Sequence, residues 1–101
     1  MKPIQDQACP LCRRNATFRF ADDENRKHFT CAHCTEYQIS TGAEKRLAES
    51  TPARRTQLSD AARDAEEGSV LVIILPTGLK QSGIANADFS IAYVPRKELP
   101  N

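Results

Sequence analysis

The chain has 101 residues, of which 40% are hydrophobic and 27% are charged, and its formal net charge is +1. This length is ordinary for one domain and too short for two independent cores, and the composition excludes a chain that is disordered throughout. The longest apolar run, VLVIIL at residues 70–75, is far shorter than the ~20 residues of a membrane-spanning helix, so we expect no membrane span.

The cysteines form two CxxC pairs, CPLC at residues 9–12 and CAHC at residues 31–34. The 18 residues between the pairs fit the spacing of a tetrathiolate zinc site. The opening residues, MKPIQDQA, lack the apolar core of a secretory signal, so we expect a cytoplasmic protein, in which cysteine pairs more often bind metal than form disulfides. The sequence therefore predicts one structural Zn²⁺ ion, and its ligands would be Cys9, Cys12, Cys31 and Cys34.

Other interpretations of the cysteines stay open at this point. A pair of disulfides, a redox-active CxxC and an iron site of the rubredoxin type would use the same residues. A redox-active pair favours the start of a helix, whereas CPLC is followed by a strand-like stretch. Four thiolates close the shell of a zinc ion, so we expect no enzymatic activity at this metal. We expect His28 and His33, which lie nearby in the sequence, to face solvent or to hydrogen-bond a thiolate.

The residues between and after the two pairs predict three short antiparallel strands. Polar and apolar residues alternate over residues 17–20, a polar turn follows at 22–25, and residues 26–30 return beside the first strand. Tyr37 and Ile39 alternate in the same way and predict the third strand.

Two CxxC knuckles at the ends of a hairpin, with a third strand beside it, resemble the zinc-ribbon family over about residues 8–40. The knuckles CPLC and CAHC and the segment EYQI carry this resemblance. It implies a fold and a range of partners, because zinc ribbons bind DNA, RNA or other proteins. The chain departs from the commonest family pattern after each second cysteine, where it has Arg13 and Thr35 instead of glycine.

Two helices are predicted after the ribbon. Thr41, with a glutamate three residues later, forms a capping box and predicts a helix over about residues 42–50. Thr51, followed by proline at the first helical position, predicts a second helix over about residues 52–67 that stops at Gly68. The apolar positions of the second helix are mostly alanine, which indicates close packing against another element.

A pair of strands is predicted near the C-terminus. The run VLVIIL at residues 70–75 is rich in β-branched residues and predicts a strand that is buried on both faces or covered by a partner. FSIAYV at residues 89–94 alternates and places Phe89, Ile91 and Tyr93 on one face. Because two strands alone are marginally stable, this pair must extend the ribbon, lie on the helices or pair across a dimer.

Together these elements predict an α+β fold with three parts in one compact domain. Residues 1–40 form the zinc ribbon, residues 41–68 the helical segment, and residues 69–101 a C-terminal β segment. The loop between the last two strands, about residues 77–88, carries two glycines, and the tail after residue 94 is expected to be exposed.

The charge of the chain disfavours a dedicated nucleic-acid binder. The isoelectric point is near 7.7, and four thiolates with one Zn²⁺ would lower the formal charge from +1 to about −1. We therefore expect a non-enzymatic interaction module, a protein–protein adaptor or accessory subunit. It would bind a partner protein or a second copy of itself through Phe89, Ile91 and Tyr93.

The alternative function is a nucleic-acid-binding regulator that uses a basic face of the ribbon. Aromatic residues lie between the basic residues and either add to that surface or form the small core of the ribbon. The aromatic residues are Phe18, Phe20 and Phe29. The basic residues are Arg13, Arg14, Arg19, Arg26 and Lys27.

Overall fold

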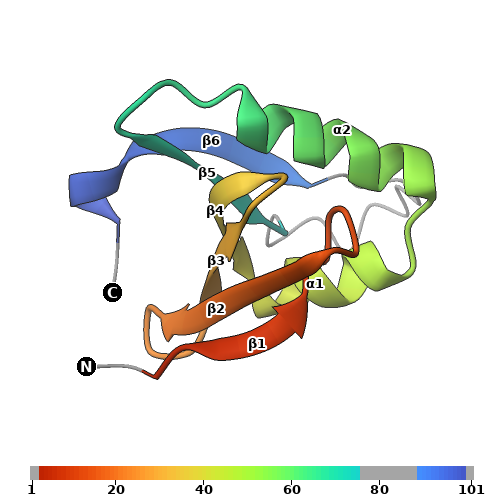
Figure 1. Cartoon of the computed structure of the whole chain (residues 1–101), viewed down its shortest axis with the longest axis horizontal. Helices are drawn as coiled ribbons and strands as arrows, with labels where there is room; N and C mark the ends of the chain where they lie inside the picture. Colours follow the sequence, from red (N-terminus) through yellow and green to blue (C-terminus); the bar gives the residue numbers. More distant parts are fainter. Residues whose placement is uncertain (1–2, 76–88, 100–101) are drawn as a thin grey trace, which may run out of the picture.

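The structure is a computed structural model that describes residues 3–75 and 89–99. Figure 1 shows strands and helices in an α+β arrangement. The strands are β1 (Gln5–Ala8), β2 (Asn15–Ala21), β3 (Arg26–Cys31), β4 (Thr35–Ser40), β5 (Ser69–Ile74) and β6 (Ser90–Pro95). The helices are α1 (Thr41–Ala48) and α2 (Pro52–Arg63), and a short 3-10 helix covers Arg96–Glu98.

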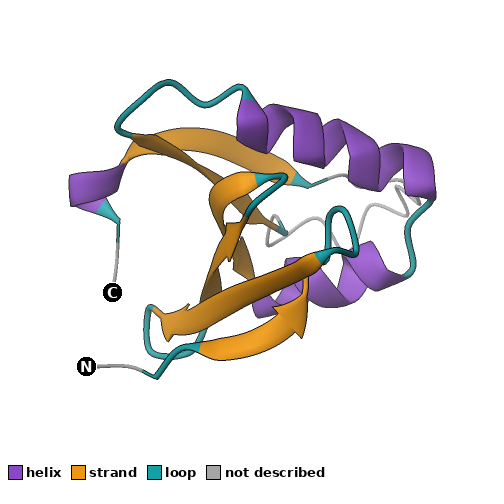
Figure 2. Cartoon of the chain, viewed as in Figure 1, coloured by secondary structure: helices purple, strands orange, loops and turns teal. Residues whose placement is uncertain are grey.

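The six strands form one mixed sheet in the order of the chain, from β1 to β6. Every neighbouring pair is antiparallel except β4 and β5, which run parallel with Tyr37 beside Leu71. Parallel neighbours need a long connection, and here α1 and α2 supply it. Figure 2 shows the two helices together on one side of the strands, and both pack against β4 and β5.

This sheet differs from the predicted division into a three-stranded ribbon and a separate strand pair. The predicted hairpin is present, with Phe18 of β2 opposite Phe29 of β3, and β5 and β6 form the predicted antiparallel pair. However, β5 joins β4, so the C-terminal pair extends the N-terminal strands. The sequence also did not predict β1, because QDQA is polar and exposed and becomes a strand only by pairing with β2. The predicted loop at 77–88 lies outside the described residues.

A row of large apolar side chains crosses the sheet on the face that the helices cover. The ring centroids of Phe18 and Phe29 are 5.3 Å apart, and those of Phe29 and Tyr37 are also 5.3 Å apart. Leu71 of β5 continues the row beside Tyr37, and Leu47 of α1 joins the same buried cluster. Phe18 and Phe29 therefore belong to the core, and Phe20 packs partly buried against it.

The prediction that the run at 70–75 is buried on both faces is confirmed for residues 70–73. Val70 and Val72 are buried, and so are Leu71 and Ile73, which point to the opposite face. A strand flanked by neighbours on both edges and covered on both faces keeps no polar positions, which explains its continuous apolar sequence.

The helix caps agree with the sequence at α2 and differ by one residue at α1. The Thr51 hydroxyl accepts a hydrogen bond from Arg54 N at 3.2 Å, as the cap before Pro52 predicts. Ser40, and not Thr41, caps α1, so this helix begins one residue earlier than predicted. Helix α2 ends at residue 63 and not 67 because the chain turns there to bring β5 beside β4. Among the described residues, neither helix is long and apolar enough to cross a membrane.

A buried polar network lies on the face of the sheet opposite the helices. His28 Nε2 donates to Glu36 at 2.6 Å, and His28 Nδ1 accepts from the Gln38 amide at 3.0 Å. Burial lowers the pKa of His28 and favours the neutral imidazole. Glu36 also accepts two hydrogen bonds from Arg96, at 2.8 and 3.0 Å. The predicted tail is therefore exposed but is attached to β4 through this ion pair.

Candidate metal centre

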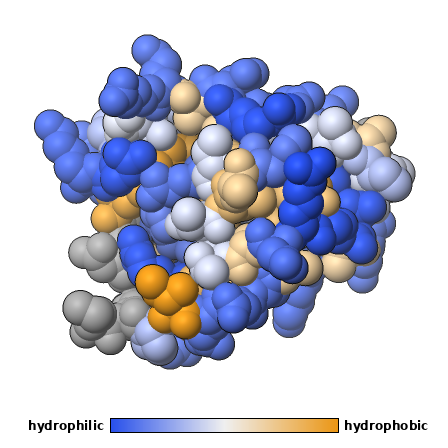
Figure 3. All heavy atoms as spheres, in the orientation of Figure 1, coloured by the Kyte–Doolittle hydropathy of each residue, from blue (hydrophilic) through white to orange (hydrophobic). Residues whose placement is uncertain are grey.

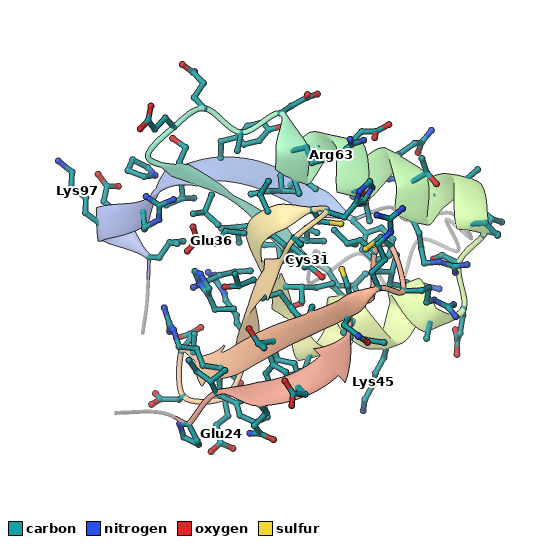
Figure 4. All side chains as sticks on the ribbon, viewed as in Figure 1. Glu24, Cys31, Glu36, Lys45, Arg63 and Lys97 are labelled. Atoms are coloured by element: carbon teal, nitrogen blue, oxygen red, sulfur yellow. The ribbon has the colours of Figure 1, made fainter. Side chains whose placement is uncertain are left out.

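The four cysteines meet where the β1–β2 and β3–β4 turns approach α2, and their sulfur atoms all lie within 4.8 Å of one another. Cys9 Sγ is 3.8 Å from Cys34 Sγ, and Cys12 Sγ is 3.5 Å from Cys31 Sγ. A tetrahedron with Zn–S bonds of ~2.3 Å has S–S edges of about 3.8 Å. Figure 4 shows the sulfur atoms grouped around Cys31, between the strand turns and α2. The residues predicted as ligands therefore fit a metal ion such as Zn²⁺.

These distances do not correspond to disulfides, and all four thiols are free. A disulfide has an S–S bond of about 2.05 Å, far shorter than the separations in this cluster. CPLC also leads into β2 and not into a helix, which is unlike a redox-active pair. Tetrahedral sulfur ligation suits both zinc and iron, and a zinc ion is the simpler structural metal because it has no redox chemistry.

Each CxxC pair is a tight turn with a hydrogen-bonded backbone. In the first, Arg13 N donates to Cys9 O at 2.7 Å, and Cys9 N donates to Arg14 O at 2.7 Å. In the second, Cys34 N donates to the Cys31 sulfur atom at 3.4 Å. This geometry directs both sulfur atoms of a pair toward one point.

The residue that follows each CxxC pair adopts an unfavourable backbone conformation. Arg13 has φ of 69° and Thr35 has φ of 73°, so each occupies the left-handed region that glycine adopts freely. For a residue with a Cβ atom this conformation is unfavourable by roughly 1–2 kcal/mol. The Thr35 hydroxyl also donates to the Ala62 carbonyl of α2 at 3.3 Å, a contact that glycine would lack.

Two buried hydroxyl groups contact the sulfur atoms. The Tyr37 hydroxyl lies 3.1 Å from Cys9 Sγ, and the Ser59 hydroxyl lies 3.0 Å from Cys34 Sγ. With metal bound the sulfur atoms are thiolates, so both hydroxyls donate to them. Burial raises the pKa of Tyr37, which keeps this hydroxyl protonated and available as a donor.

The thiol pKa values reflect the same contacts. The hydrogen bond with Cys34, aided by Tyr37 and opposed by burial, lowers the pKa of Cys9 to about 4. The hydrogen bond with Cys9 and burial raise the pKa of Cys34, and burial raises that of Cys12.

Sequence reasoning missed both of these hydroxyl donors. Tyr37 was expected only as an apolar position of the third strand, and Ser59 was not singled out. The available signal was the position of Ser59, three residues before Ala62 on the buried side of α2. A serine within an otherwise apolar stripe needs a polar partner when it is buried, and the cysteines are that partner.

Removing the Ser59 hydroxyl tests this contact. Ser59→Ala is expected to weaken zinc affinity by about 10- to 100-fold, the usual effect of losing a hydrogen bond to a metal ligand. Competition with a chromophoric chelator measures the affinity. Ser50→Ala is the matched control because the Ser50 hydroxyl donates to the Arg46 carbonyl, away from the sulfur atoms. Equal affinities of Ser59→Ala and wild type would contradict the assigned role.

The five basic residues predicted for nucleic-acid contact do not share one surface. Successive side chains of a strand point to opposite faces, so Arg19 and Phe18 point to opposite faces of the sheet. Lys27 is on the helix-covered face, where its amino group contacts Glu44 at 3.1 Å. Arg26 bonds Gln38 on the other face. Arg13 and Arg14 lie in the first CxxC turn, exposed beside Cys12.

The predicted partner residues of β6 separate into two environments. Ile91 and Tyr93 are 45% and 48% exposed, and the Tyr93 hydroxyl donates to the Ala61 carbonyl at 2.9 Å. Phe89 is partly buried and packs against the core, with the Arg54 guanidinium 5.8 Å from its ring centroid. The apolar surface therefore consists of Ile91 and Tyr93, with Phe89 anchoring the start of the strand.

Comparisons with protein-family models, curated protein sequences and solved structures found no match to the chain. What this protein does must therefore be inferred from its own residues. Those residues offer a four-cysteine cluster suited to a metal ion and an edge strand with exposed apolar side chains.

Proposed function

We propose that this protein is a non-enzymatic interaction module of the zinc-ribbon type. In this proposal a Zn²⁺ ion at the four-cysteine cluster stabilises the fold, and the outer edge of β6 binds an extended segment of a partner protein. The observation that carries the proposal is the exposure of Ile91 and Tyr93, 45% and 48%, on a strand at the end of the sheet.

A structural role for the metal is supported by the closed ligand set. Four thiolates would occupy every position of a tetrahedral ion, so neither water nor substrate could bind it. Two contacts connect the second CxxC turn to α2, because Cys34 contacts the Ser59 hydroxyl and Thr35 donates to the Ala62 carbonyl. Loss of the ion would therefore loosen the helix as well as the turns.

The backbone hydrogen bonding of β6 supports the proposal that its outer edge binds the partner segment. Arg96 N donates to Gly68 O at 2.8 Å, toward the β5 side of the strand. Because hydrogen-bonding directions alternate along an antiparallel strand, Ile91, Tyr93 and Pro95 direct their backbone groups to the outer side. Pro95 has no N–H group and loses no sheet hydrogen bond in this position. Among the described residues, no strand pairs with that side.

The composition of β6 supports an extended peptide as the occupant. Sheet edges usually carry charges that prevent pairing with other chains, but SIAYV at residues 90–94 carries none. An added strand would bond to the outward backbone groups, and its alternate apolar side chains would pack on Ile91 and Tyr93. Figure 1 shows β6 at the opposite end of the sheet from β1, clear of the N-terminal strands.

The interface is tested with two aspartate substitutions on neighbouring residues. Ile91→Asp places a charge on the proposed contact face, whereas Ser90→Asp adds the same charge on the other face of the strand. With zinc-loaded proteins as bait, the partner should be retained by wild type and by Ser90→Asp, and about tenfold less by Ile91→Asp. Hydrogen exchange of the complex should show slowed exchange at the Ile91 and Tyr93 amides.

Four results would contradict the proposal. Equal retention by the two variants would place the contact elsewhere, as would protection confined to other strands. Outright unfolding of Ile91→Asp, seen by circular dichroism, would make β6 ordinary core. Self-association that Ile91→Asp abolishes would identify a second copy of the chain, and not another protein, as the occupant.

A further inference from the structure

A hollow of about 350 Å³ lies beside the metal centre, between the first CxxC turn and α2, and it is open to solvent. Arg13 and Arg14 line one side, and Arg55 and Arg63 of α2 line the other. Figure 3 shows strongly hydrophilic side chains gathered where the β1–β2 turn meets α2. Residues about 40 positions apart in the sequence thus form one basic surface.

Three of these arginines have no carboxylate partner among the described residues. Arg63 pairs with Asp60 on its own helix. Arg55 uses one nitrogen to donate to the Ser50 carbonyl at 2.9 Å, which leaves its other donors available. Arg13 and Arg14 are exposed and enter none of the ion pairs seen in residues 3–75 and 89–99.

The negative charge of a zinc-loaded metal centre would not cancel the positive charge of these arginines. A Zn²⁺ ion with four thiolates carries about −2, and Asp60 adds one negative charge to the hollow. Against these stand four arginines, so the surface keeps a net positive charge when the metal is bound. Arginine also offers its donors in a planar fork that fits the oxygen atoms of phosphate.

We propose that this hollow is a binding site for a phosphate group, with Arg13, Arg14 and Arg55 as its donors. A phosphate monoester carries a charge of about −1.5 to −2 and three acceptor oxygens, which suits three guanidinium groups without carboxylate partners better than a carboxylate ligand does. The site is separate from the β6 interface. It requires a folded first CxxC turn, because Arg13 and Arg14 directly follow Cys12.

Two sources can supply such a phosphate, a small phosphorylated molecule or the backbone of a single-stranded nucleic acid. Both would place a phosphate between the turn and the helix. Because the hollow is open to solvent, a longer strand could also pass through it. The probes are therefore inorganic pyrophosphate, titrated by calorimetry, and a fluorescein-labelled oligothymidine of about ten nucleotides, followed by anisotropy.

The experiment compares zinc-loaded wild type with Arg14→Gln, Arg55→Gln and the control Lys45→Gln at about 50 mM salt, where phosphate contacts are strongest. Lys45 lies on α1, and Figure 4 shows its side chain directed away from the sulfur atoms. Arg14→Gln and Arg55→Gln are each expected to weaken binding by about tenfold, and Lys45→Gln to leave it within about twofold. Zinc content and melting temperature are measured for each variant.

Binding of pyrophosphate alone with this pattern supports the site and assigns it to small phosphorylated ligands. Tighter binding of oligothymidine, weakened by the same two variants, supports the site and assigns it to nucleic acid. Absence of binding by either probe overturns the proposal, and so does equal weakening by Lys45→Gln. Arg55→Gln also loses the bond to Ser50, so Arg14→Gln, whose exposed side chain supports no other element, decides the result if Arg55→Gln is destabilised. None of these outcomes affects the test of β6 by the Ile91→Asp and Ser90→Asp variants.

Discussion

Cys34→Ser is expected to abolish stoichiometric zinc binding and to unfold most of the protein at 37 °C. Cys34 is buried, lies 3.8 Å from the Cys9 sulfur atom and accepts the Ser59 hydroxyl. Binding of a structural zinc ion contributes about 10–16 kcal/mol in small zinc-dependent folds. A domain of this size has a total stability of roughly 5–15 kcal/mol, so loss of the ion removes most or all of it.

Chelation separates the effect of losing the metal from any other effect of the substitution. Serine is nearly the same size as cysteine, so Cys34→Ser leaves no cavity to explain a large loss. Wild type treated with a strong chelator should melt like the variant, and added zinc should restore only the wild type. The measurements are zinc content by atomic emission and the thermal transition by circular dichroism. An unchanged transition after chelation would show that the metal is not structural.

Phe29→Ala is expected to lower the free energy of unfolding by about 3–5 kcal/mol. Phe29 is fully buried, and its ring lies between Phe18 and Tyr37, with both centroid distances at 5.3 Å. Truncation would leave a cavity in the middle of the row that holds β2, β3 and β4 against the helices. It would also remove the packing that fixes Tyr37, whose hydroxyl contacts Cys9.

Phe20→Ala is the matched control for this truncation. Phe20 makes an edge-to-face contact with Phe18, at a centroid distance of 5.4 Å, and is partly exposed at the margin of the core. Its loss should therefore cost clearly less than the loss of Phe29. Urea denaturation with excess zinc gives both free energies of unfolding. Equal losses, or a larger loss for Phe20→Ala, would contradict the role assigned to the row.

Local sequence signals predicted much of the fold because they act over a few residues. The CxxC spacing correctly predicted that the four cysteines lie together, and Thr51 before proline correctly predicted the start of α2. The continuous apolar run at 70–75 predicted a strand buried on both faces, which β5 is. In each case the decisive residues are adjacent in the sequence, so their meaning does not depend on the rest of the chain.

Features that depend on distant pairing could not be predicted in the same way. The sequence of residues 70–75 does not indicate that this strand pairs with β4 in parallel. That pairing depends on how α1 and α2 position β5. The basic hollow has the same origin, because Arg14 and Arg55 meet only after α2 packs on the metal centre. The strand alternation of Arg19 and Lys27 was readable, and it already indicated opposite faces.

The parallel pairing of β4 and β5 also has a consequence for the order of folding. All four metal ligands and the strands from β1 to β4 precede residue 41, so they leave the ribosome first. Their contacts are local and antiparallel, and such contacts form faster than distant parallel ones. A metal ion could therefore bind the four cysteines of a nascent chain while the aromatic row is still uncovered. Until α1, α2 and β5 have been synthesised, an uncovered apolar row of this kind is prone to aggregation.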